Sequence, residues 1–248
     1  FLPLTAANKA ALLDVIRNLG INADKTNNAS TAETFYEALQ MFTAGAVWKG
    51  KETPGKYDHS AISGTKYVGT PNSSCNNHIV YIANGKPQDN DATALDRLKS
   101  VGGDYTAISY PSSYISVPDQ GNWSDEWARF LYSRADTSTS VEGKQSIRVH
   151  AVAVTGAPSD GNYPNFIHEI ARQGGGEYYA ASDVDTLTTA LLSIFNGMLA
   201  VNSVFTSAAL PISTNAQGTY DNQVFVGLFR PDAKARPRWN GNLKQYKF

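Results

Sequence analysis

The chain has 248 residues, with 21 Lys and Arg against 22 Asp and Glu, and a single Cys. A net charge of −1 supplies no field that would gather nucleic acid or an anionic membrane surface, because such binding needs clustered Lys and Arg. One Cys and four His offer neither an internal disulfide nor the paired spacings of a zinc site.

Charged residues make up 17% of the chain, below the roughly 25% of an average soluble domain. Asn, Ser, Thr, Gly and Tyr take their place, which is common in secreted proteins. The longest apolar run, 190–201, is interrupted by polar residues and is shorter than the roughly 18 residues of a membrane span. The composition therefore predicts an extracellular protein with no membrane insertion.

The first part of the chain has helical periodicity. Thr5 is a favoured N-cap, and the apolar spacing after it predicts a helix over 6–19. Ser30 and Glu33 have the spacing of a capping box, and the apolar residues that follow predict a second helix. Between 48 and 77 the periodicity vanishes, which indicates a long surface loop.

The central part alternates strands with helices, and this order is typical of a parallel α/β sheet. Two nearly continuous apolar runs, 78–83 and 147–154, have the composition of strands buried on both faces, and we expect them to be parallel neighbours. The three glycines at 174–176 indicate a helix stop. In chain order the prediction is a strand at 78–83, helices at 91–100 and 122–134, a strand at 147–154, a helix at 165–173, a strand at 177–180 and a long helix capped by Ser182 and Asp185.

From residue 204 onward the period changes to two. The run 222–229 alternates apolar and polar residues, and Asn240-Gly241 has the composition of a hairpin turn that leads into the final run. The only β partner that we expect for this final run is the strand at 224–229. The predicted organisation is therefore an α/β domain over 1–200 and a β segment over 201–248.

Several segments together resemble one family. They are STAETFYEA at 30–38, the single Cys75 shortly before IVYIANGKP at 79–87, EWARFLY at 126–132, GGGEYYAA at 174–181 and WNGNLKQY at 239–246. Their order is similar to a von Willebrand factor A domain, and in particular to that domain of the PilC/PilY family of type IV pilus tip-associated proteins. The resemblance covers nearly the whole chain.

The resemblance implies a von Willebrand factor A (Rossmann-like) fold and a divalent cation at the carboxyl end of its sheet. Family members hold the ion with an Asp-x-Ser-x-Ser loop, a Thr and an Asp, since hard cations prefer oxygen ligands. This chain has no Asp-x-Ser-x-Ser segment, Ala29 aligns with the Thr, and Asn84 stands in place of the Asp. Thr31 and Asn84 are therefore the candidate ligands of a degenerate site. We expect weak binding of Mg²⁺ or Ca²⁺ and no other cofactor.

By the same resemblance the chain is a non-enzymatic module of a pilus tip protein at the outer surface of a Gram-negative bacterium. Its implied roles are adhesion, surface sensing, pilus biogenesis and twitching motility, and its implied partners are minor pilins and host or abiotic surfaces. The family's first strand and metal loop precede Phe1, so we expect further residues upstream, and WNGNLKQY is expected to lead into a C-terminal β-propeller. The main alternative is a metal-dependent adhesion domain unrelated to pili. The third hypothesis is an enzyme, such as a hydrolase that uses one of the chain's carboxylates in catalysis.

Other candidate residues have simpler interpretations. Cys75 is expected to be a half-cystine whose partner lies outside the chain, since catalysis would need a base such as His78 within reach. The segment 89–91 is expected to cap a helix, not to bind calcium. The carboxylates at 119, 125, 126 and 136 are expected to be caps or solvated residues. Four aromatic residues are candidates for a contact surface, although packing in the core or in a loop explains them equally well: Tyr105, Tyr110, Tyr114 and Trp123.

Overall fold

The structure is a computed structural model, and it describes residues 5–18, 30–49, 61–69, 77–88, 91–138, 144–155, 162–202, 205–209, 223–230 and 240–247. The predictions for Cys75, Ala29 and the pair 89–90 concern residues outside these ranges. The chain divides into two compact units, Phe1–Leu187 and Thr188–Phe248. This division falls within a long helix, whereas the boundary predicted from the sequence lies at residue 200.

The first unit contains a three-stranded parallel sheet in the order β3-β4-β5, formed by β3 (Asn77–Ala83), β4 (Ile147–Val154) and β5 (Gly175–Ala181). In the β3–β4 pair, Ile79 lies opposite Val149. The prediction that these two strands are parallel neighbours is confirmed. The unit is a mixed α/β structure with helices flanking a parallel sheet, which is consistent with a Rossmann-like fold.

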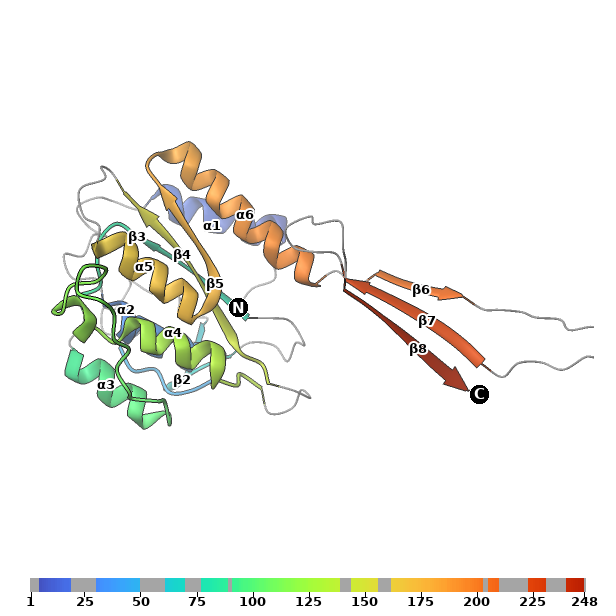
Figure 1. Cartoon of the computed structure of the whole chain (residues 1–248), viewed down its shortest axis with the longest axis horizontal. Coiled ribbons are helices and arrows are strands. Elements are labelled where there is room, and N and C mark those ends of the chain that lie inside the picture. The colour runs from blue at the N-terminus through green and yellow to red at the C-terminus, as the bar shows by residue number, and fades with distance from the viewer. Residues whose placement is uncertain are drawn as a thin grey trace, which may run out of the picture. The chain divides into compact units, whose positions relative to one another are not determined.

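Helices α4 (Ser124–Ser133) and α5 (Asn162–Gln173) pack against each other and against β4 on one face of the sheet (Figure 1). Helix α2 (Thr31–Phe42) packs on α4, and α3 (Asp91–Ser100) packs on α2. The fully buried Trp127 joins these helices, because its indole N–H donates to the Ala94 carbonyl at 3.0 Å. The core of this unit therefore lies between one sheet face and four helices.

Strand burial agrees with the sequence for β4 and differs for β3. The central strand β4 is buried on both faces along most of its length. In β3 most side chains are only half-buried, and Ile82 is 49% exposed. The prediction that β3 is buried on both faces is wrong, because β3 is an edge strand of the described sheet and β4 is its only described neighbour.

The caps of two helices also differ from the prediction. Thr5 caps α1 (Ala6–Arg17) as expected, by accepting from the Asn8 amide. Ser30 makes no side-chain cap hydrogen bond, and Glu33 pairs with Lys49 at 3.1 Å. The predicted capping box is therefore wrong, because a nearby ammonium competes for the Glu33 carboxylate.

At the start of α6 (Val184–Asn202), Asp183 accepts from the Thr186 amide at 2.8 Å, and the Thr186 hydroxyl accepts from two amides, those of Ser182 and Asp183. The capping residue is thus Asp183, and the predicted role of Ser182 with Asp185 is wrong. No helix in the described ranges has both the length and the apolar character needed to cross a membrane.

The glycine triplet does more than stop a helix. Gly174 forms the turn after α5, but Gly175 and Gly176 already belong to β5. Gly175 has φ +64°, which disfavours other residues, and a Cβ on Gly176 would lie 2.6 Å from the Val149 carbonyl carbon. The triplet therefore lets β5 approach β4 closely, beside a register shift between Val149 and Ala151.

The second unit contains an antiparallel sheet in the order β6-β7-β8, formed by β6 (Phe205–Ala209), β7 (Gln223–Arg230) and β8 (Asn240–Lys247). The predicted pairing of the final run with the strand at 224–229 is confirmed. The predicted turn at Asn240-Gly241 is wrong, because both residues pair within β8.

The region predicted as a loop also contains a short hairpin of β1 (Ile62–Ser63) and β2 (Lys66–Tyr67).

Candidate functional site

The carboxyl end of the parallel sheet is the first place to look for a site, because open α/β sheets bind ligands outside the ends of their strands. At this end the first turn of α2 meets β3: the Thr31 hydroxyl lies 2.8 Å from the Tyr81 hydroxyl. The Tyr81 ring packs edge-on against Phe35, which fixes the position of its hydroxyl. Thr31 is nearly buried, so its oxygen is already committed to a neighbour within the chain.

A second tyrosine closes the end of β3. Tyr163, at the start of α5, donates its hydroxyl to the carbonyl of Ala83, the last residue of β3. Burial and the nearby Tyr81 raise the pKa of Tyr163 to about 12, so it stays neutral. Two tyrosines and one threonine therefore supply neutral hydroxyl groups, and no charge, at this edge.

The charged residues at the same edge neutralise each other. Lys86, three residues after β3, forms an ion pair with Asp119 at 2.7 Å, and Ser116 donates to the other carboxylate oxygen at 2.6 Å. Burial alone would raise the pKa of Asp119, but the hydrogen bonds from Lys86 and Ser116 outweigh it and lower that pKa. Asp119 is thus an ionised structural partner and not a solvated carboxylate.

These residues do not fit a tight divalent-cation site. Asn84 lies exposed in the bend after β3 and contributes no charge, the Thr31 hydroxyl bonds Tyr81, and Asp119 is held by an ammonium. Across the described ranges, no three His, Cys, Asp or Glu residues come together in a metal-binding group.

We predict that the chain binds Mg²⁺, Mn²⁺ or Ca²⁺ more weakly than about 10⁻⁴ M, the range of weak extracellular modules. The physical reason is that both candidate ligands, Thr31 and Asn84, carry no charge and the nearby Asp119 carboxylate is paired with Lys86. Isothermal titration calorimetry checks this, and Asn84→Asp alone should not produce tight binding. A dissociation constant well below 10⁻⁴ M for the unmodified chain would contradict the prediction.

The acidic pair at the start of α4 is the main feature that the sequence analysis missed. Asp125 and Glu126 are 2% and 1% exposed, so the expectation that they are solvated is wrong. Tyr110 donates its hydroxyl to Asp125 at 2.7 Å, and the Ile108 amide donates to Oε1 of Glu126 at 2.6 Å. These bonds tie the long connection between α3 and α4 to the first turn of α4.

The surroundings of this pair favour a protonated Glu126 at neutral pH. Burial, the charge of Asp125 and a hydrogen bond to it raise the pKa of Glu126 to about 9. Burial also raises the pKa of Asp125. As a carboxylate, Glu126 would leave Oε2 buried with no donor among the described residues. As a neutral acid the same group carries no charge, so its burial costs less free energy.

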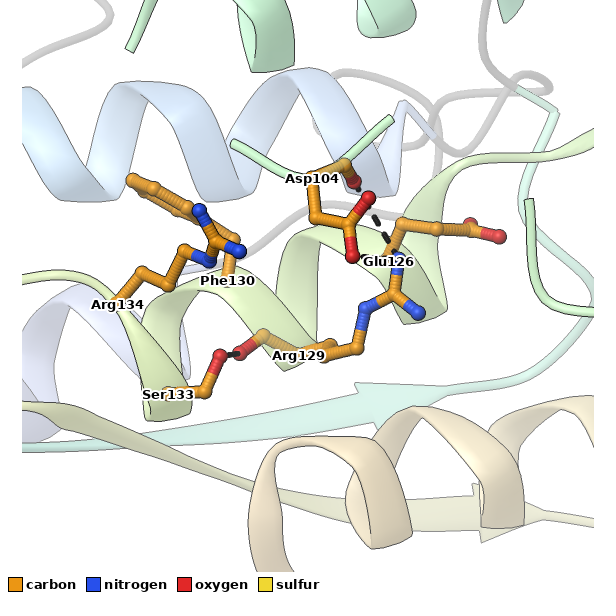
Figure 2. Close-up of a pocket in the computed structure, with 6 residues that line it drawn as sticks. All are labelled: Asp104, Glu126, Arg129, Phe130, Ser133 and Arg134. Atoms are coloured by element: carbon orange, nitrogen blue, oxygen red, sulfur yellow. Dashed lines mark hydrogen bonds and ion pairs between the residues drawn. The ribbon is translucent and has the colours of Figure 1, made fainter. Parts of the chain in front are cut away.

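A small cavity of about 160 Å³ lies beside Glu126 (Figure 2). Its lining consists of Asp104, Glu126, Arg129, Phe130, Ser133 and Arg134. Arg129 donates to the backbone carbonyls of Asp104 and Thr106, and the Glu126 carboxyl points away from Asp104 and Arg134. The arginine is therefore engaged in holding the connection in place.

The remaining candidates have structural partners. Asp136 lies exposed in the loop between α4 and β4 and accepts from the amides of Ser138 and Gln145, so among the described residues it caps no helix. Of the four aromatic residues, Tyr110, Tyr114 and Trp123 are half-buried against the core, and Tyr105 alone is well exposed, at 63%. Packing therefore explains three of the four.

No protein-family model, no curated protein and no solved structure matches the chain.

Proposed function

We propose that the chain is the von Willebrand factor A-like domain of a PilC/PilY-type pilus tip protein and acts as a non-enzymatic adhesion and assembly module. It would be displayed outside the cell at the pilus tip, associated with the outer membrane, and would bind minor pilins and host or abiotic surfaces. The observation that carries the proposal is the parallel β3–β4 pair, formed by the strands that the family resemblance places next to each other.

The carboxyl edge of the sheet supports a role in binding rather than catalysis. The hydroxyl groups of Thr31 and Tyr163 bond to neighbours within the chain, and the ion pair of Lys86 with Asp119 is also internal. The buried acids Asp125 and Glu126 bind the connection between α3 and α4. These two carboxyl groups are therefore already engaged and are poor candidates for the catalytic groups of a hydrolase. The same edge favours adhesion that does not depend on a tightly bound ion.

The adhesion role predicts that pili carrying the protein without residues 1–200 still assemble but adhere poorly. The β segment is retained in this variant, and the proposed contact module is lost. Adhesion per pilus to epithelial cells and to glass, together with pilus counts by electron microscopy, measures the two functions separately.

The matched control removes only residues 1–18, whose helix α1 has no buried side chain, and should adhere normally. Loss of pili with unchanged adhesion per pilus would reverse the assigned roles. Tight cation binding in the calorimetric measurement, together with normal pili, would instead favour the metal-dependent adhesion domain.

A further inference from the structure

Two histidines meet on the sheet face opposite α4 and α5. Val149 and Ala151 belong to the core under these helices, so the alternating residue His150 points to the other face. The β3–β4 register pairs Val80 with His150 and therefore places His78 on that same face. The planes of the two imidazole rings are inclined at 27°, with ring centroids 5.2 Å apart and Nδ1 of His78 3.0 Å from Nε2 of His150. They meet through a nitrogen–nitrogen hydrogen bond.

A backbone amide fixes the direction of this bond. The Glu177 N–H donates to Nδ1 of His150 at 3.1 Å. Because a backbone amide can only donate, Nδ1 is an acceptor and the proton of neutral His150 sits on Nε2. That N–H donates to Nδ1 of His78, and the proton of His78 is then on its Nε2. A one-way chain of hydrogen bonds runs from β5 through β4 to β3.

These two hydrogen bonds leave no nitrogen that can accept an additional proton without breaking one of them. A proton on His150 must go to Nδ1, which faces the Glu177 N–H, and a proton on His78 must go to Nδ1, which faces the His150 N–H. In either case two donors face each other and one of the two hydrogen bonds is lost. Nε2 of His78 is buried with no partner among the described residues, so no acceptor there stabilises a cation.

The surrounding charges act in both directions. The Arg148 guanidinium on β4, which donates to the Gly175 carbonyl, opposes protonation of both rings. The Glu177 carboxylate on β5 accepts from the Tyr179 hydroxyl and favours a proton on His150. Burial is the largest influence: with the charges of His150 and Arg148 it lowers the pKa of His78 to about 4, and it also lowers the pKa of His150.

We propose that the His78–His150 pair is an acid-sensitive latch that ties β3, β4 and β5 together at neutral pH and opens when either ring gains a proton. The latch strengthens the folded sheet above the ordinary histidine pKa of about 6.5, and this contribution disappears as the pH falls from there to about 4. Strand β3 would loosen first, because β4 is its only described neighbour in the sheet. This inference does not depend on the adhesion role.

The test is histidine ¹⁵N NMR of the full chain between pH 7.5 and 4.5, with the urea-unfolded chain as reference. Both rings are expected in the Nε2–H form and to become protonated only at lower pH than the histidines of the unfolded chain, and the Glu177 amide should lose its protection against hydrogen exchange as they do. An Nδ1–H form of either ring, or titration of both rings as in the unfolded chain, would overturn the latch.

Two variants separate the latch from general acid sensitivity. His78→Asn retains an acceptor for the His150 N–H but cannot be protonated, so the midpoint of acid unfolding should move to lower pH. His168→Asn alters a half-exposed histidine on α5 and should leave the His78 and His150 signals unchanged. An unmoved midpoint in His78→Asn would count against the latch, and if that variant fails to fold, the NMR titration of the unmodified chain still decides.

Discussion

Replacing Glu126 with glutamine is expected to stabilise the protein at neutral and alkaline pH. Glutamine can accept from the Ile108 amide as Glu126 does, but it carries no proton that an unfolded chain would release. The hydrogen bond from the Ile108 amide therefore remains neutral at every pH. The variant should show the stability that the unmodified chain has only in acid.

The sign follows from the pKa of Glu126, which is raised from 4.5 to about 9 in the folded state. Below pH 4.5 both states are protonated and nothing is lost. Between 4.5 and about 9 the unfolded chain releases this proton first, so the free energy of unfolding falls by up to about 1.4 kcal/mol per pH unit. At pH 8 the gain from Glu126→Gln is expected to be about 2 to 4 kcal/mol.

Urea unfolding of the two proteins at pH 5, 6.5 and 8 measures this effect. The two free energies of unfolding should differ by less than about 1 kcal/mol at pH 5 and separate further as the pH rises. Asp125→Asn is the matched control: it removes the neighbouring charge but not the burial, which is the larger cause, so much of the pH slope should remain. A slope that is the same with and without the Glu126 carboxyl would show that the proton is not held on this residue.

Replacing Gly176 with alanine is expected to be among the most damaging single changes to the sheet. The added methyl group would overlap the Val149 carbonyl group and lie 2.8 Å from the His150 amide nitrogen. Both are backbone atoms of the central strand, so they cannot move aside without breaking the β4–β5 pairing. The cost should exceed the roughly 1–3 kcal/mol of ordinary overpacking and reach about 4 kcal/mol.

Gly85→Ala is the control, because nothing lies within 4 Å of its added methyl group and its φ is not positive. Its stability should change by less than about 1 kcal/mol and can even rise, since alanine restricts the unfolded chain. Urea unfolding of both variants gives the comparison. If Gly176→Ala is as stable as Gly85→Ala, the close approach of β5 to β4 is not required.

Periodicity predicted most elements of the first unit for a physical reason. The strand 147–154 and the helix over α4 bury continuous or regularly spaced apolar side chains, and burial of such patterns is what selects their conformation. The ends were less predictable. Ser30 and Glu33 have the spacing of a capping box, but Glu33 instead forms an ion pair with Lys49, which follows the end of α2.

In the candidate site, too, the sequence predicted the position of residues but not their contacts. The sequence placed Thr31 and Asn84 near the carboxyl end of the sheet by resemblance, and the absence of charge at Asn84 was already visible. It could not show that Tyr81 takes the Thr31 hydroxyl or that Lys86 holds Asp119, because each contact joins residues more than 30 positions apart.

By itself, then, the sequence determined the α/β alternation, the parallel pairing of 79–83 with 149–154 and the β character of the last residues, since these follow from local spacing and from the helices that connect successive strands. The tertiary structure alone decided which polar residues are buried. In the sequence Asp125 and Glu126 resemble solvated helix residues, and His78 and His150 resemble ordinary strand residues. Their burial becomes evident only in the folded structure. Protonation depends on that loss of water and on the partners that distant segments supply, and local sequence contains neither.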